Sequence, residues 1–147
     1  MKKIAVLLLS CCALLQAQAV DRGWFTDVPQ ALAKAKKENK MVVLDFTGSD
    51  WCTWCMKFKK EAIDTQEFAT YASQNLVLVE VDFPRRTAQA AELKKANKAL
   101  EAQYHVDGFP TFVFLSKDGK ELGRQSGYHP GGPQPFIARL ERLKKNN

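Results

Sequence analysis

Two cysteines three positions apart, Cys52 and Cys55, are the residues of this sequence best suited to chemistry. They follow an apolar run over residues 41–46 and a short turn, and they open a segment whose composition suits a helix. Cys52 then lies in the first helical turn, where free backbone N–H groups and the helix dipole stabilise a thiolate. Cys55 lies one turn further, close enough to form a disulfide with Cys52. Such a pair can attack another disulfide through Cys52 and release the mixed disulfide through Cys55.

A carboxyl group, that of Asp45, lies inside the apolar run before the cysteines. A nearly continuous apolar run predicts a strand buried on both faces, and therefore a central strand of a mixed or parallel sheet. Burial of an unpaired carboxylate is costly, so Asp45 is expected to be neutral part of the time or to have a partner. A carboxyl with a raised pKa beside two thiols can accept the proton of Cys55. The alternative is that Asp45 caps the following turn.

A second landmark is the sequence Gly108-Phe109-Pro110-Thr111, directly before the apolar run of residues 112–115. Proline cannot donate to a sheet ladder, so Pro110 at the start of a strand indicates an edge, a first residue or a cis bond. Residues 116–120 contain an Asp-Gly pair and predict a hairpin, with a return strand that starts at Glu121.

The remaining segments predict helices around a sheet. Asp27 and Pro29 indicate the start of a helix over residues 30–39, and Asp64 with Glu67 forms a capping-box pattern before a short helix. Residues 76–81 predict a strand, residues 87–103 a long polar helix, and the last segment a helix. The predicted inner faces are Phe68, Tyr71 and Ala72; Leu93, Ala96 and Leu100; and Phe136, Ile137, Leu140 and Leu143. Tyr104 and Tyr128 are predicted to be core residues.

The first 19 residues have the pattern of a secretory signal peptide. Two lysines precede an apolar run over residues 4–15, which is too short to span a bilayer, and Ala17-Gln18-Ala19 forms a small-x-small cleavage site. Cleavage there leaves a domain of about 128 residues, 20–147. The protein is therefore expected to be secreted or periplasmic. In the alternative, a lipobox-like sequence before Cys11 makes Cys11 a lipid-bearing N-terminus, although the apolar run before it is short.

The predicted cleavage also changes the cysteine count. Cys11 and Cys12 lie in the leader, so Cys52 and Cys55 are the only thiols of the mature chain. A disulfide across so small a loop constrains the unfolded chain little, which favours a working redox pair over a structural bridge. The mature chain also keeps 20 basic and 16 acidic residues. The lysines are scattered over helices without interleaved aromatics, so no nucleic-acid partner is predicted.

The order of these elements and both motifs resemble the α/β thioredoxin fold, a central mixed sheet flanked by helices. The segment around Trp51-Cys52-Thr53-Trp54-Cys55 most resembles secreted bacterial thioredoxin-like, thiol:disulfide interchange proteins. The resemblance implies that Cys52 is the nucleophile, that Cys55 is the resolving thiol and that Asp45 is the buried acid. It further implies that Pro110 is the cis-proline facing the disulfide. The expected substrate-binding residues are Trp51, Thr53, Trp54, Phe109 and Pro110.

Four departures from plain thioredoxin matter. The turn between Asp45 and Cys52 is one residue longer, which affects the reach of the carboxyl. The residues between the cysteines are neither Gly-Pro nor the pairs of strong oxidants, so the direction of exchange stays open. The negative charge of Asp50 repels the Cys52 thiolate and therefore works against a very low pKa of Cys52. The segment from Pro84 to Leu100 is also longer and is expected to shape a partner surface.

The predicted function is dithiol–disulfide exchange with other proteins, as a periplasmic reductase or isomerase kept reduced by a membrane partner. No metal and no cofactor other than the Cys52–Cys55 disulfide is predicted. A structural zinc site needs four ligands, and His105 and His129 are not suitably spaced. Haem attachment and a papain-like nucleophile are disfavoured by the residues around Cys55. Two alternatives remain, a thiolate module that delivers a soft metal ion and an adaptor whose cysteines merely oxidise.

Overall fold

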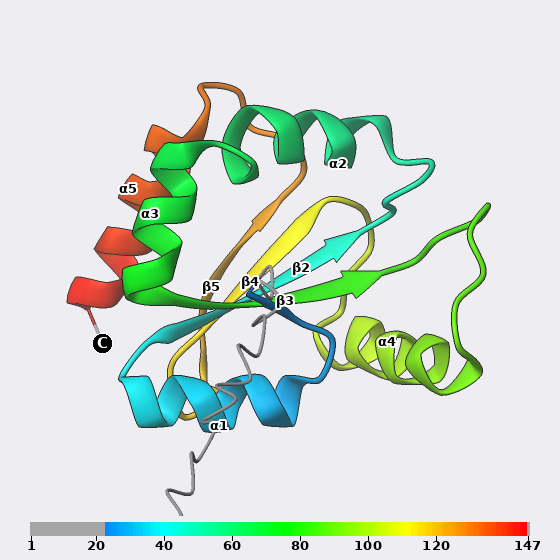
Figure 1. Ribbon diagram of the computed structural model, residues 1–147, viewed down its shortest axis with the longest axis horizontal. Helices are drawn as coiled ribbons and strands as arrows, with labels where there is room; N and C mark the ends of the chain where they lie inside the picture. The colour runs from blue at the N-terminus through cyan, green and yellow to red at the C-terminus, as the bar shows by residue number, and fades with distance from the viewer. Residues whose placement is uncertain (1–22, 147) are drawn as a thin grey trace, which may run out of the picture.

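The computed structural model describes residues 23–146, which form one five-stranded sheet with helices on both faces (Figure 1). The strands follow the order β1-β3-β2-β4-β5 across the sheet. Their bounds are β1 Trp24–Phe25, β2 Met41–Thr47, β3 Leu76–Asp82, β4 Thr111–Leu115 and β5 Glu121–Ser126. The two antiparallel pairs are β2 with β4 and β4 with β5, and the other pairs are parallel. The predicted mixed α/β sheet is confirmed.

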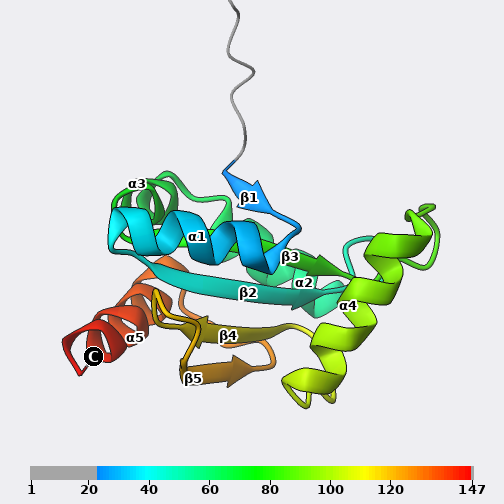
Figure 2. The ribbon, with the colours of Figure 1, turned by 90° about the horizontal axis from the view of Figure 1, so that it is seen from below.

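Two layers of helices cover the sheet (Figures 1 and 2). Helices α1 and α4 lie on one face, and α2, α3 and α5 lie on the other. The helix bounds are α1 Val28–Glu38, α2 Thr53–Phe58, α3 Gln66–Asn75, α4 Ala91–Gln103 and α5 Pro133–Lys145, and a π-helical turn η1 Lys59–Ile63 continues α2. None of the helices within residues 23–146 is long and apolar enough to cross a membrane.

Strand β2 lies at the centre of the sheet and is buried along its whole length, as predicted. Side chains alternate between the faces of a strand. Val42, Leu44 and Phe46 accordingly join the core beneath α1, whereas Met41 and Val43 join the core beneath α2, η1, α3 and α5. By the same alternation, the Asp45 side chain points to the same face of the sheet as Met41 and Val43, which is the face covered by α2.

Several local signals act as the sequence predicts. The Asp27 side chain accepts a hydrogen bond from the Gln30 N–H at the start of α1, and Asn39 ends that helix in the left-handed conformation, with a φ of 55°. The hairpin between β4 and β5 places Gly119 at a φ of +86°. The apolar residues of α5 face the core. The predicted signal peptide and the Cys11 alternative lie outside the described residues.

Two predictions about helix α4 are wrong. The helix begins at Ala91 instead of residue 87. Residues 85–87 form a bend, and their backbone N–H groups bond to a carboxylate outside the helix. Ala96 is exposed, and the fully buried residue of α4 is Asn97. The Asn97 Nδ2 group donates to the Asp82 carbonyl at 2.8 Å, so a polar contact to the end of β3 replaces an apolar one.

The predicted cap of helix α3 is also displaced by one residue. Thr65 is the N-cap, and its hydroxyl oxygen accepts a hydrogen bond from the Phe68 N–H at 3.2 Å. Asp64 instead ends the π-helical turn η1 and pairs with Lys59 at 2.9 Å. A threonine oxygen caps this helix end because the preceding turn already engages the carboxylate.

Candidate active site

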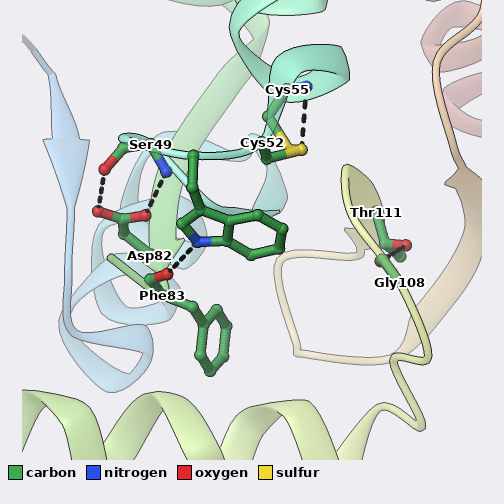
Figure 3. Close-up of a disulfide and its surroundings, with 8 residues drawn as sticks. Ser49, Cys52, Cys55, Asp82, Phe83, Gly108 and Thr111 are labelled. Atoms are coloured by element: carbon green, nitrogen blue, oxygen red, sulfur yellow. Dashed lines mark hydrogen bonds between the residues drawn. A yellow bond between two sulfur atoms is a disulfide. The ribbon is translucent and has the colours of Figure 1, made fainter. Parts of the chain in front are cut away.

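Cys52 and Cys55 form a disulfide at the start of α2, with an S–S distance of 2.09 Å. Cys52 is the N-cap residue of α2, and the Cys55 backbone N–H donates to its sulfur at 3.2 Å (Figure 3). Both cysteines are buried, with exposed fractions of 6% and 4%. The predicted position of Cys52 at the helix start is confirmed. An N–H group aimed at its sulfur stabilises the negative charge of a thiolate.

The turn between β2 and α2 fixes the position of Cys52. The Cys52 N–H donates to the Gly48 carbonyl at 2.9 Å, and the Ser49 N–H donates to the Asp82 carboxylate at 2.9 Å. The Ser49 hydroxyl bonds to the same carboxylate (Figure 3). A Cβ atom at Gly48 would lie only 2.5–2.7 Å from the Trp51 ring. The close approach of Trp51 to the backbone therefore requires glycine at this position.

Asp50 has a structural function that the sequence did not reveal. Its carboxylate accepts hydrogen bonds from the backbone N–H groups of Arg85, Arg86 and Thr87 at 2.9, 2.8 and 2.7 Å. These bonds, the one from Arg85 first, lower the pKa of Asp50 to about 2. Asp50 thus ties the loop after β3 to the turn before Cys52. Its predicted repulsion of the Cys52 thiolate stays a prediction.

The predicted substrate-binding residues Trp51, Phe109 and Pro110 come together. The Trp51 indole N–H donates to the Phe83 carbonyl at 2.7 Å, and its ring packs edge-on against Phe109 with centroids 5.9 Å apart. The Phe109–Pro110 peptide bond is cis, as predicted. A hydrogen bond from the Thr111 hydroxyl to the Gly108 carbonyl closes the segment that holds this bond (Figure 3).

Trp54 and Thr53 lie on the exposed start of α2. The Trp54 side chain has an exposed fraction of 54%, and its ring lies against Tyr128 with centroids 5.1 Å apart. The Lys57 ammonium lies 5.5 Å from the Trp54 ring and 4.9 Å from the Tyr128 ring. Tyr128, predicted to be a core residue, is only partly buried and packs against the edge of the core. Its ring is half-buried, and its hydroxyl donates to Glu61 at 2.6 Å because the loop before α5 brings it to the surface beside α2.

Asp45 is buried, with an exposed fraction of 9%, and its Oδ1 atom has no hydrogen-bond partner. Burial is the main cause that raises the pKa of Asp45 to about 8, and the charge of Glu80 adds to it. Lys59 on η1 acts in the opposite direction. Glu80 is the residue paired with Asp45 in the β2–β3 register. The predicted burial and raised pKa are confirmed, and the proton-accepting role of Asp45 stays a prediction.

Glu80 is an ionisable neighbour of Asp45 that sequence reasoning missed. Burial raises its pKa, and the charge of Asp82 adds to the shift. The alternation of Glu80 and Asp82 in an apolar strand was the available signal, since it places both carboxyls on one face. Within residues 23–146, no group of three or more His, Cys, Asp and Glu side chains is arranged to hold a metal ion.

Three comparisons place this geometry among known proteins. A model of the thioredoxin-like domain matches residues 28–144. The disulfide bond reductase DsbH of Chlamydia pneumoniae is 40% identical over 116 residues, which cover 79% of this chain and 69% of DsbH. A solved structure of a DsbH oxidoreductase superposes with a TM-score of 0.76 at 38% identity and covers 84% of this chain and 85% of its own.

A longer relative contains a similar segment. The thiol:disulfide interchange protein DsbD of Vibrio vulnificus is 32% identical over 119 residues, which cover 80% of this chain but only 18% of DsbD. The family match extends over most of the described residues and includes both cysteines and the cis-proline. The chain belongs to the thioredoxin-like family.

Proposed function

We propose that this protein reduces or isomerises disulfide bonds of other proteins in the periplasm. Its activity is thiol:disulfide oxidoreduction, because the chain belongs to the thioredoxin-like family and has both cysteines at the start of α2. The single observation that carries the proposal is the Cys52–Cys55 disulfide, with a backbone N–H directed at the Cys52 sulfur. The 40% identity to a protein named disulfide bond reductase supports the reducing direction.

The reaction begins when the Cys52 thiolate attacks one sulfur of a substrate disulfide. A bond forms between Cys52 and that sulfur, the substrate disulfide breaks, and the other substrate sulfur leaves as a thiolate that takes a proton. The helix start and the Cys55 N–H stabilise the attacking thiolate. The cis peptide segment at Pro110, the half-buried ring of Trp51 and the exposed ring of Trp54 receive the substrate chain beside the sulfur.

The second step releases the substrate. In molecules whose Asp45 is ionised, the Cys55 thiol loses its proton to that carboxylate, and the Cys55 sulfur attacks Cys52, which frees the substrate thiolate and closes the Cys52–Cys55 disulfide. Two electrons have then passed from the protein to the substrate. The raised pKa of Asp45, about 8 in this oxidised state, keeps the transferred proton on the carboxyl at neutral pH.

The product of this reaction, the Cys52–Cys55 disulfide, must be reduced before the next cycle. An oxidising compartment holds no soluble thiol pool that supplies these electrons. A membrane protein that passes electrons from the cytoplasm to its own external dithiol provides them, which is why a membrane redox partner belongs to the proposal. The signal-peptide pattern over residues 1–19 supports export.

The test is to trap the intermediate. In the Cys55→Ser variant the second step is blocked, so incubation with a disulfide-bonded protein is expected to give a covalent adduct at Cys52 that disappears with dithiothreitol. Cys52→Ser is the matched control and is expected to give no adduct. The wild-type protein is expected to accelerate the reduction of insulin by dithiothreitol. Failure to trap any adduct, together with no insulin reduction, would contradict the proposal.

The same preparation distinguishes the soft-metal alternative. The reduced wild-type protein, incubated with Cu(I) and desalted, is expected to retain no stoichiometric metal and to keep its insulin activity. Tight, stoichiometric Cu(I) binding with loss of disulfide exchange would favour a metal-delivery module instead.

A further inference from the structure

A cavity of about 520 Å³ lies between the loop that follows β3 and helix α4, and Trp51, the residue before Cys52, is part of its lining. Its aromatic wall consists of Trp51, Phe83 and Phe109. Phe83 and Phe109 are stacked with centroids 5.1 Å apart, and Trp51 meets Phe109 edge-on. Trp51 adjoins the nucleophilic Cys52 in the chain. The cavity, called the Trp51 pocket below, therefore shares one wall residue with the turn that leads into the nucleophilic Cys52.

The rim of the Trp51 pocket is cationic. The Arg85 guanidinium lies 3.5 Å from the Trp51 ring centroid, and the Lys98 ammonium lies 5.3 Å from the Phe83 ring centroid. Lys94 is the third cation of the lining, and Glu101 is its one carboxylate, already paired with Lys98 at 2.7 Å. In the part of the chain that the structure describes, Arg85 and Lys94 make no ion pair.

The loop that carries Arg85 is held in place before any substrate arrives. Asp50 accepts three of its backbone N–H groups, and the Gln89 amide donates to the Asp82 carbonyl at 3.1 Å. The Asp50 carboxylate is thus bonded to backbone N–H groups and, in the described part of the chain, forms no ion pair with the Arg85 guanidinium, which lines the pocket. A charge held in one position loses little entropy when it binds a partner.

We infer that the Trp51 pocket binds an acidic side chain of the substrate protein, within a few residues of the cysteine that Cys52 attacks. The inference rests on the proposed function and specifies its substrate class. The aromatic wall packs against the methylene groups of a glutamate or aspartate, and Arg85 and Lys94 pair with its carboxylate. Charge complementarity favours this occupant over neutral or basic segments, which leave both cations unpaired.

The test compares three disulfide-bonded peptides that differ at one position beside the cysteine, which is Glu, Gln or Lys. The reduced wild-type protein is expected to reduce the Glu peptide with a kcat/KM about fivefold above that of the Gln peptide, and the Lys peptide more slowly than both. This preference is expected to shrink at high ionic strength, because the pocket is open to solvent. In the double variant Arg85→Gln, Lys94→Gln, the ratio of kcat/KM for the Glu peptide to kcat/KM for the Gln peptide is expected to fall toward one.

The matched control is the double variant Lys37→Gln, Lys145→Gln, which removes two charges from exposed positions on α1 and α5, remote in sequence from the pocket. It is expected to keep the wild-type preference. An equal loss of preference in both double variants, or no preference in the wild-type protein, would overturn the pocket assignment while the proposed function stands. If the wild-type protein reduces none of the three peptides, the proposed function fails and the inference fails with it.

Discussion

At the residue scale, burial and a neighbouring carboxyl keep Asp45, in the centre of the sheet, protonated at neutral pH. Asp45 has an unbonded oxygen and faces Glu80 across the β2–β3 register, so both burial and a neighbouring charge oppose its ionisation. In the disulfide state, with a pKa of about 8, Asp45 holds a proton at neutral pH. In the proposed mechanism, this proton passes to the leaving Cys55 sulfur when a partner dithiol opens the disulfide.

Asp45→Asn removes this proton and is expected to slow reduction of the disulfide. At about pH 6 the wild-type protein should react at least about tenfold faster with dithiothreitol than the variant, and the ratio should approach one above about pH 9. Tryptophan fluorescence in stopped flow measures both rates. Comparing rates at each pH cancels the ionisation of dithiothreitol itself.

Glu80→Gln is the informative companion variant. It removes the like charge beside Asp45, so the pKa of Asp45 is expected to fall, and the pH at which the rate advantage disappears should fall with it. The advantage itself should persist, because the Asp45 carboxyl remains. A rate ratio for Asp45→Asn that does not change with pH would mean that Asp45 acts only through packing.

At the element scale, the turn between β2 and α2 connects the disulfide to the proposed substrate surface. Gly48 lets the Trp51 ring lie directly on the backbone, and that ring then bonds to Phe83 and packs on Phe109. The Trp51 indole thus contacts three segments that are distant in the sequence. They are the turn itself, the loop after β3 and the cis-proline segment. Any change that moves Trp51 alters all three.

Gly48→Ala tests this dependence. The added methyl group meets the Trp51 ring at well below contact distance, so the ring must shift, and the free energy of unfolding is expected to fall by about 1–3 kcal/mol. Near-UV circular dichroism and denaturant unfolding measure the two effects. Gly108→Ala is the matched control, since a Cβ atom there meets nothing within 4 Å. Unchanged spectra and stability in Gly48→Ala would refute the close packing of Trp51.

At the scale of the whole molecule, stability depends on pH through the same buried carboxyl. Asp45 has a pKa of about 8 in the folded protein against an ordinary value of 3.8, so the folded state binds more protons between these values. Stability therefore falls as pH rises through this window and levels off above it, by at most about 1.4 kcal/mol for each pH unit. The lowered pKa of Asp50 acts oppositely, but only toward acidic pH below its ordinary value.

The oxidised wild-type protein is accordingly expected to be more resistant to urea at about pH 5 than at about pH 8.5. Asp45→Asn should show a much smaller difference between the two pH values, because its amide does not titrate. Urea unfolding followed by circular dichroism, with the disulfide intact, gives both midpoints. Equal pH dependence in the two proteins would show that Asp45 is not the responsible group.

The sequence by itself determined the parts of this protein that depend on local order. The apolar run, the turn and Cys52-x-x-Cys55 specify strand, turn and helix start, and Pro110 marks the second landmark. Asp45 was recognisable as buried because it interrupts a strand that is apolar on both faces. These signals depend on residues within a few positions of one another, where periodicity and capping act directly.

Only the tertiary structure decided which distant residues complete the site. Arg85 lies over Trp51, Tyr128 against Trp54, and Glu80 beside Asp45, across separations of more than thirty residues. The early start predicted for α4 was also wrong, since residues 85–87 form a bend whose N–H groups bond to Asp50 in the distant turn before Cys52. Strand register and long-range hydrogen bonds fix these pairs, and neither leaves a periodic trace in the sequence.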